Sequence, residues 1–316
     1  MNQMNVWGMT DIGLVRKENQ DAYVTAQHTA SGRTVGVVCD GMGGPAGGRV
    51  ASQIAVSVYL EELEKLLTAD QTPQQLLEAS AQAAALANQA IQAEAERREE
   101  CRNMGTTLVS AISYDGGVVV TNVGDSRAYH ITEDGITRIT KDHSLVESMV
   151  DRGDITAEEA RRHPSRNLIT RALGRDTNAA CDSFIRPMES GSYILLCTDG
   201  LNSMLRDEEI EAVMQETSNE IDTCTKALIQ GALDLGGHDN VTVVLCQIVP
   251  EENKPSVQDM QQTVSTFTEK ERKKPLRKFV LWTVAFVFVL LLACLAWSFS
   301  TAWQNKIIQW YEQTVK

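Results

Sequence analysis

Four aspartates border apolar runs in a way that predicts a cluster of carboxylates. "VGVVCDG" and "YILLCTDG" each end an apolar run on an aspartate and a glycine, at Asp40 and Asp199. In "GGHDNVTVVLC" the order is reversed, and Asp239 comes just before the apolar run. Asp125 lies at a break between two apolar stretches in "VVVTNVGDSRAY". Strand ends can gather at one rim of a sheet assembly, where close carboxylates repel each other and need protons or metal ions.

The predicted cluster offers only oxygen ligands, which favour a hard cation such as Mg²⁺ or Mn²⁺. Two such ions about 3.5–4 Å apart can activate a bridging water and hold a phosphoryl group. "GLVRKENQDAYV" adds Asp21 to the set, and Arg16 in the same stretch could bind phosphate through two N–H groups. The five histidines show no HxH or HExxH spacing, so a zinc site is disfavoured.

The elements that position these residues follow from hydrophobic periodicity. "YDGG" and "EDGI" predict hairpin turns, which favour antiparallel pairing. Capping-box patterns predict two short helices after residue 143, and another helix opens near Asp207. We therefore expect one α+β domain over residues 1–249, with antiparallel sheets and long helices packed on them. The predicted strands are 34–40, 106–114, 117–125, 127–132, 192–199 and 241–249, and the long helices are 49–67 and 74–100.

Two other interpretations of the glycine-flanked aspartates are open. Asp-Gly is a common hairpin turn, but neither Asp40 nor Asp199 is followed by a second strand pattern. The Gly-rich stretch "GMGGPAGGRVAS" could be a nucleotide-binding loop. It lacks both the GK[ST] ending of a P-loop and the GxGxxG spacing of a dinucleotide site, so this function is disfavoured.

The C-terminal part of the chain carries the pattern of a membrane anchor. Residues 279–303 contain no charged side chain, and a bilayer core needs about 20 apolar residues in a helix. Six cations lie just before this run, in residues 270–278, and basic residues favour the cytoplasmic side. We expect a polar and then basic linker at 250–278, a transmembrane helix at 279–303 and a short extracytoplasmic tail at 304–316. The length of the run disfavours the alternative of a buried core helix. The protein is then expected at the cytoplasmic membrane, with residues 1–249 in the cytoplasm.

The charge distribution restricts the partners. The whole chain has a net charge of -13, although residues 270–278 carry six cations and one anion. The part before the basic segment is therefore even more acidic than the whole. Because phosphate contacts require a basic face, we expect no nucleic-acid partner. The seven scattered cysteines predict no disulfide framework.

Several motifs resemble those of one enzyme family, in order and spacing. They are "DIGLVRKENQD", "VVCDGMGG", "MGTTLV", "NVGDSRAY", "LITRALG", "LLCTDGL" and "GGHDNVTVV". Over residues 6–249 the chain resembles the bacterial metal-dependent protein phosphatases, the PPM or type 2C family. The resemblance implies a β-sandwich of two antiparallel sheets flanked by helix pairs. It also implies hydrolysis of phosphoserine and phosphothreonine in proteins by a metal-activated water, with two Mn²⁺ or Mg²⁺ ions and a possible third.

The same resemblance assigns metal ligands to the aspartates. Asp40 would bridge both ions, and the carbonyl oxygen of Gly41 would bind the second. Asp199 and Asp239 would bind the first ion. Asp125, together with Asp199, would hold the third, weaker ion.

The remaining roles are carried over in the same way. Asp21 would support the cluster through a water, and Arg16 would bind the phosphate, so the catalytic set is Arg16, Asp40 and Asp199. Residues 143–170 fall where the family has a mobile flap. Gln20 stands where many members have Glu, and Met42 where eukaryotic members have a proposed catalytic His.

These departures keep a second class of function open. The chain could be a catalytically weak or inactive, membrane-tethered regulatory relative of the same fold. The favoured hypothesis is an active phosphatase that opposes a membrane-associated Ser/Thr kinase, with that kinase and its phosphorylated substrates as partners. Tethering would raise the local concentration of the enzyme near such substrates.

Overall fold

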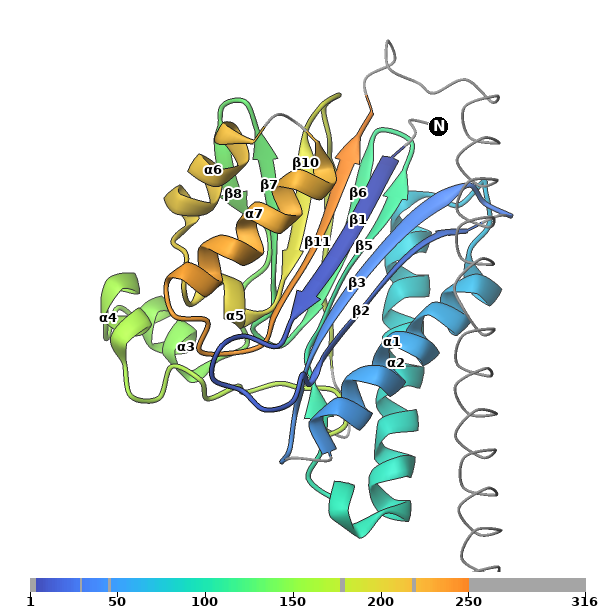
Figure 1. The fold of residues 1–316 in the computed structure, drawn as a ribbon. Helices are drawn as coiled ribbons and strands as arrows, with labels where there is room; N and C mark the ends of the chain where they lie inside the picture. Colours follow the sequence, from blue (N-terminus) through green and yellow to red (C-terminus); the bar gives the residue numbers. More distant parts are fainter. Residues whose placement is uncertain (1–3, 29, 45–46, 177–179, 218–219, 250–316) are drawn as a thin grey trace, which may run out of the picture. The chain divides into compact units, whose positions relative to one another are not determined.

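Two antiparallel β-sheets form the centre of the molecule (Figure 1). The computed structural model describes residues 4–28, 30–44, 47–176, 180–217 and 220–249. The first sheet has the order β1 (Met4–Asp11), β11 (Val241–Ile248), β10 (Tyr193–Cys197), β7 (Arg127–Thr132) and β8 (Gly135–Arg138). The second has the order β2 (Asp21–His28), β3 (Arg33–Met42), β5 (Leu108–Tyr114), β6 (Gly117–Val123) and β9 (Asp182–Pro187), and β4 (Gly105–Thr106) pairs with β3.

A pair of helices covers the outer face of each sheet (Figure 1). α1 (Gly47–Leu66) and α2 (Pro73–Arg97) pack on the second sheet, and the short helix η1 (Glu99–Cys101) follows them. α6 (Asp207–Glu216) and α7 (Ile221–Asp234) pack on the first. The prediction of an α+β sandwich of two antiparallel sheets flanked by helix pairs is confirmed.

The alternation of side chains along β3 shows how the layers are built. Val35, Val37 and Cys39 belong to the core shared with α1 and α2, whereas Val38 belongs to the core between the sheets. Successive side chains on a strand point to opposite faces. Asp40 therefore lies on the same face as Val38, at the end of the layer between the two sheets.

The elements absent from the sequence prediction are mostly sheet edges. β1, β2 and β9 each lie at the edge of a sheet, and residues of β2 are half-buried along most of its length. A strand covered on only part of its surface tolerates polar residues, so its apolar pattern is weak. α7 was also missed. The predicted strand 117–125 ends at Val123 in the structure, which leaves Asp125 in the turn before β7.

No helix in the described part of the chain is long and apolar enough to cross a membrane. The predicted transmembrane helix at 279–303, the linker at 250–278 and the tail at 304–316 lie outside the described residues.

A close backbone contact generates a first prediction. A Cβ atom at Gly200 would lie 1.9 Å from the carbonyl oxygen of Asn240, just before β11. We expect Gly200→Ala to lower the free energy of unfolding by about 1–3 kcal/mol, because the backbone would have to move apart. Urea denaturation checks this.

The matched control for this prediction is Gly231→Ala in α7. A Cβ there would meet Leu205 at 3.4 Å, an ordinary contact distance, and alanine favours a helix over glycine. Equal stability of the two variants would contradict the tight packing at Gly200.

Candidate active site

Asp21 and Asp40 form a cross-strand pair at one end of the sandwich. Asp21 is the first residue of β2 and lies opposite Asp40 of β3 in the strand register. The hydroxyls of Thr198 and Thr242 donate hydrogen bonds to Oδ2 of Asp21 at 2.9 and 2.7 Å. Thr242 belongs to β11 and Thr198 follows β10, so both hydroxyls come from the first sheet. Asp21 thereby links the two sheets beside Asp40.

Asp199 and Asp125 complete a group of four carboxyls, of which Asp125 is buried and the other three are half-buried. Asp199 opens α5 (Asp199–Asn202), a single turn of helix after β10, and its side chain lies beside that of Asp40. Asp125 lies in the turn between β6 and β7, 7% exposed. Oδ1 of Asp125 and Oδ1 of Asp199 are buried and accept no hydrogen bond. A buried acceptor without a donor costs free energy, so these two oxygens are suited to a cation.

The pKa values of the four carboxyls are raised. Burial is the largest cause in each case, and repulsion by neighbouring carboxylates adds to it. The pKa of Asp21 rises to about 7 despite the hydrogen bonds from Thr198 and Thr242, and that of Asp199 rises to about 6. The pKa values of Asp40 and Asp125 lie well above their usual range. The cluster therefore needs protons or cations near neutral pH.

Arg16 and Asp239 contact each other directly. Nη2 of Arg16 donates to Oδ2 of Asp239 at 2.6 Å, and the Arg16 side chain is 53% exposed. Oδ1 of Asp239 accepts the backbone N–H of Asn240 at 2.8 Å. In the part of the chain that the structure describes, no group of three or more Asp, Glu, His or Cys side chains is already arranged to hold a metal ion. Asp239 can act as a ligand only when Arg16 releases or shares its carboxylate.

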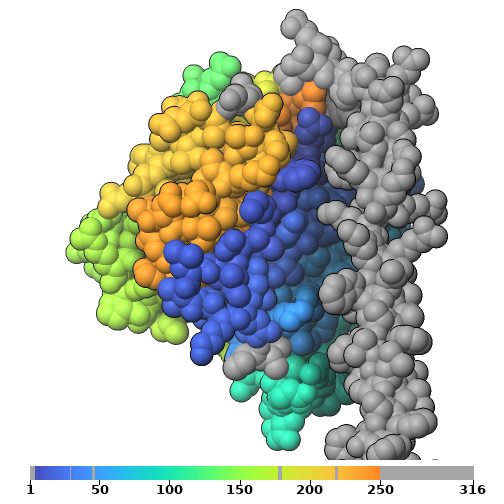
Figure 2. Space-filling model, viewed as in Figure 1, coloured from blue at the N-terminus to red at the C-terminus, as the bar shows by residue number. Residues whose placement is uncertain are grey.

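Asn240 is a positioning residue that the sequence analysis did not single out. It is 5% exposed, and its Oδ1 accepts the backbone N–H of Gln20 at 2.8 Å. Its Nδ2 donates to the carbonyl oxygens of Ile12 and Glu18 at 2.9 and 3.0 Å. Asn240 thus fixes the loop that carries Arg16. Figure 2 shows this dark-blue N-terminal segment at the surface beside the orange segment that includes α7.

Gln20 and Met42, the two departures from the family pattern, have defined places. The side-chain amide of Gln20 donates to the carbonyl oxygen of Gly44 at 3.0 Å, in the loop after β3. Met42 is the last residue of β3. A Cβ at Gly41 would lie 2.1 Å from the carbonyl oxygen of Gly48, so only glycine fits there. Through its hydrogen bond to Gly44, Gln20 contacts the glycine-rich loop, and as an amide it brings no negative charge to the site.

Comparison with known proteins identifies the family. The model of the protein phosphatase 2C family matches residues 15–235. The chain belongs to this family. The serine/threonine phosphatase stp of Listeria innocua serovar 6a is 35% identical over 241 residues, which cover 75% of this chain and 93% of that protein. The predicted class of enzyme, a protein phosphatase, is confirmed.

Solved structures agree with this assignment. The serine/threonine phosphatase of S. agalactiae superposes with a TM-score of 0.72 at 30% identity, covering 78% of this chain and 99% of that chain. The catalytic domain of the phosphatase PstP, solved in complex with two manganese ions, gives a TM-score of 0.67 at 34% identity, covering 78% and 99%. The two-sheet fold of this protein phosphatase 2C domain is therefore that of its bacterial relatives.

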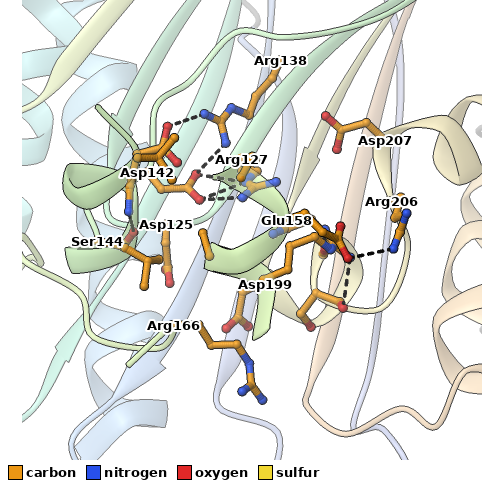
Figure 3. Close-up of a pocket in the computed structure, with 18 of the residues that line it drawn as sticks. Asp125, Arg127, Arg138, Asp142, Ser144, Glu158, Arg166, Asp199, Arg206 and Asp207 are labelled. Carbon is orange, nitrogen blue, oxygen red and sulfur yellow. Dashed lines mark hydrogen bonds and ion pairs between the residues drawn. The ribbon is translucent and has the colours of Figure 1, made fainter. Parts of the chain in front are cut away.

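The flap segment, residues 143–170, lies over one side of the site. It contains α3 (Leu145–Asp151) and α4 (Ala157–Arg162). Nδ1 of His143 accepts a hydrogen bond from the backbone N–H of Gly124 at 3.0 Å. The backbone N–H of His143 donates a hydrogen bond to the carbonyl oxygen of Gly124 at 2.9 Å. This anchors the start of the segment next to Asp125. A cleft of about 430 Å³ lies between the flap segment and the helices α5 and α6, and Asp125 and Asp199 line it (Figure 3).

The raised pKa values predict how the stability of the phosphatase domain depends on pH. Asp21 and Asp199 titrate at about 7 and about 6 in the fold, against 3.8 ordinarily. Between about pH 4 and pH 7 the folded state therefore binds more protons than the unfolded chain, and its stability falls as the pH rises. We expect the Tm of the chelator-treated protein to fall over this range, and Asp21→Asn to flatten the fall.

Added Mn²⁺ is expected to raise Tm more at pH 7 than at pH 5, because protons compete with the metal for the same carboxylates. Asp222→Asn, on the exposed face of α7, removes a carboxylate outside the cluster and serves as the control. A pH profile of Asp21→Asn that matches the parent profile would contradict the assignment of the titration to this cluster.

Proposed function

We propose that this protein phosphatase 2C domain hydrolyses phosphoserine and phosphothreonine in proteins, using two Mn²⁺ or Mg²⁺ ions. The observation that carries the proposal is the group of carboxyls at one end of the sandwich. Four carboxyls there repel each other, and two of their oxygens accept no hydrogen bond. Near neutral pH, where fewer protons are bound, such a site gains stability from divalent cations, which prefer oxygen ligands.

The residues present fit such ions. Asp40, the carbonyl oxygen of Gly41, Asp199 and Asp239 would hold the two core ions, and Asp125 with Asp199 would hold a third. When bound, the ions supply a water that is activated near neutral pH and positive charge for the phosphoryl oxygens. Hydrogen bonds from Thr198 and Thr242 hold Asp21 next to Asp40. There its negative charge adds to the attraction for cations.

Arg16 is proposed to bind the phosphate of the substrate. Its exposed guanidinium pairs with Asp239 at the edge of the cluster, and turning it outward would place two N–H donors on phosphoryl oxygens. Cys39 neighbours Asp40 but is fully buried, and burial raises the pKa of its thiol far above neutral pH. It is therefore not a nucleophile, and the proposed reaction proceeds without a phosphoenzyme.

Direct assay of turnover tests the proposed function. We expect the full chain to hydrolyse a phosphothreonine peptide with Mn²⁺ or Mg²⁺ and to stop in chelator. Asp40→Asn and Asp199→Asn should each lower kcat at least about 100-fold, because each removes charge that holds the ions and the transition state. Asp222→Asn is the control and should match the parent.

Substantial turnover in both aspartate variants would overturn the metal assignment. If the parent binds Mn²⁺ but hydrolyses no phosphopeptide, the alternative of a regulatory relative is favoured. The variants to test next are then Gln20→Glu and Met42→His.

We also propose that the enzyme is tethered to the cytoplasmic membrane and opposes a membrane-associated Ser/Thr kinase. The proposal is supported by the uncharged run at 279–303 and by the basic residues just before it. The partners are then that kinase and its phosphorylated substrates.

Membrane fractionation checks the tether. The full chain should stay in the membrane fraction after an alkaline carbonate wash, and a chain ending at residue 278 should be released. If the shortened chain reverses phosphorylation in cells as well as the full chain does, the tether has no part in the function.

A further inference from the structure

The helix α4 of the flap segment is attached to the domain by polar contacts. None of its residues is buried. Its N-terminus carries a capping box between Thr156 and Glu159, which satisfies the first backbone N–H groups of the helix. Because none of its residues is buried, charged side chains that reach across the cleft contribute to its position.

Two such contacts join α4 to the segment that follows Asp199. Nη1 and Nη2 of Arg161 donate to the carbonyl oxygens of Asn202 and Ser203 at 3.0 and 3.4 Å. Glu158 Oε1 accepts a hydrogen bond from Nη2 of Arg206 at 3.2 Å. Figure 3 draws this second contact as a dashed line between Glu158 and Arg206, two residues that line the cleft.

The carbonyls that Arg161 binds belong to the end of α5. This helix has a single turn, Asp199–Asn202, and Asp199 is its first residue. The last carbonyl groups of a helix lack partners within the helix, and a cationic side chain there stabilises it. Arg161 therefore caps the C-terminus of the same turn whose N-terminus presents Asp199 to the carboxylate cluster.

Asp199 depends on this turn for its orientation. Its Oδ1 is buried and accepts no hydrogen bond. Its side chain lies against Asp40, and the backbone of α5, whose residues after Asp199 are buried, sets the position from which the carboxylate projects. A shift of that turn moves the ligand oxygen directly.

We propose that Arg161 is a positioning residue that couples the flap segment to metal binding through α5 and Asp199. With α4 docked, Arg161 fixes α5 and Asp199 holds its ion tightly. With α4 lifted, the cap is lost and the ion is held more weakly. The inference rests on the proposed function, since it takes Asp199 as a metal ligand.

The sign of the effect separates positioning from simple electrostatics. Arg161 is a cation near a site for cations, so its charge alone weakens metal binding, and removing that charge would tighten it. If Arg161 acts by fixing α5, removing it weakens metal binding instead. The two explanations predict opposite changes in the Kd for Mn²⁺.

The experiment measures Mn²⁺ binding to the metal-free full chain by isothermal titration calorimetry. We compare the parent with Arg161→Gln, Arg161→Lys and Arg152→Gln. Arg152 is the matched control, because its side chain is 59% exposed and its ion pair is with Asp154 of the same flap segment. We expect Arg161→Gln to raise the Kd about three- to tenfold, the scale of one or two lost hydrogen bonds. Arg161→Lys should restore part of the affinity, and Arg152→Gln should leave it unchanged.

Turnover of p-nitrophenyl phosphate provides the second readout. Arg161→Gln should require more Mn²⁺ for half-maximal rate and should recover the parent kcat at saturating Mn²⁺. Arg206→Gln removes the other contact and should weaken Mn²⁺ binding in the same direction, which keeps the test decisive if Arg161→Gln folds poorly. Equal or tighter Mn²⁺ binding in the folded Arg161 or Arg206 variants overturns the coupling.

Failure of the underlying function gives a different result. If the parent binds no Mn²⁺, or if Asp199→Asn binds it as well as the parent does, the metal assignment of Asp199 is wrong. If the parent binds Mn²⁺ through Asp199 and Arg161→Gln is unchanged, the metal assignment holds and the coupling through α5 is wrong.

Discussion

Repulsion among closely spaced carboxylates is the constraint on which the rest of this structure depends. Asp21 and Asp40 face each other across β2 and β3, and Asp199 and Asp125 lie close enough to raise the pKa of Asp40. Such a cluster destabilises the fold unless protons, hydrogen-bond donors or cations compensate it. The hydroxyls of the first sheet, the guanidinium of Arg16 and the raised pKa values are all responses to that constraint.

The compensation involves both sheets. Asp21 and Asp40 belong to the second sheet, whereas Asp199 follows a strand of the first. Asp125 lies where the chain crosses from β6 in the second sheet to β7 in the first. Any cation held by these carboxylates therefore joins the two layers. The positions of the carboxylates therefore depend on how the two sheets stack, and a bound cation would in turn stabilise that stacking.

The sequence predicted the parts of this arrangement that depend on local patterns. The central strands β3, β5, β6, β10 and β11 are buried and apolar, so their periodicity identified them and placed Asp40 and Asp199 after them. The edge strands β1, β2 and β9 are only partly buried and gave no such signal. The family resemblance supplied the sandwich and the candidate ligands, and the structure gathers four of these aspartates at one end of it.

What the sequence could not show are contacts between residues far apart in the chain. The pairing of Arg16 with Asp239, the support of Asp21 by Thr198 and Thr242, and the hydrogen bonds of Asn240 all join segments separated by more than 170 residues. Among these contacts, only Asn240 had a signal in the sequence: its amide side chain lies directly between Asp239 and the predicted strand 241–249. The contacts of Arg161 with α5 are equally invisible, because an arginine on a short polar helix is ordinary surface chemistry.

The absence of buried residues in α4 has a consequence for how such enzymes diverge. Substitutions in a helix without core contacts cost the fold little, so this turn can accumulate changes that the sandwich would not tolerate. At positions of this turn other than Glu158 and Arg161, natural variation can thus alter the wall of the cleft while the carboxylate cluster stays intact. A lineage of related phosphatases could acquire new preferences for protein substrates there without changing how Asp199 is held.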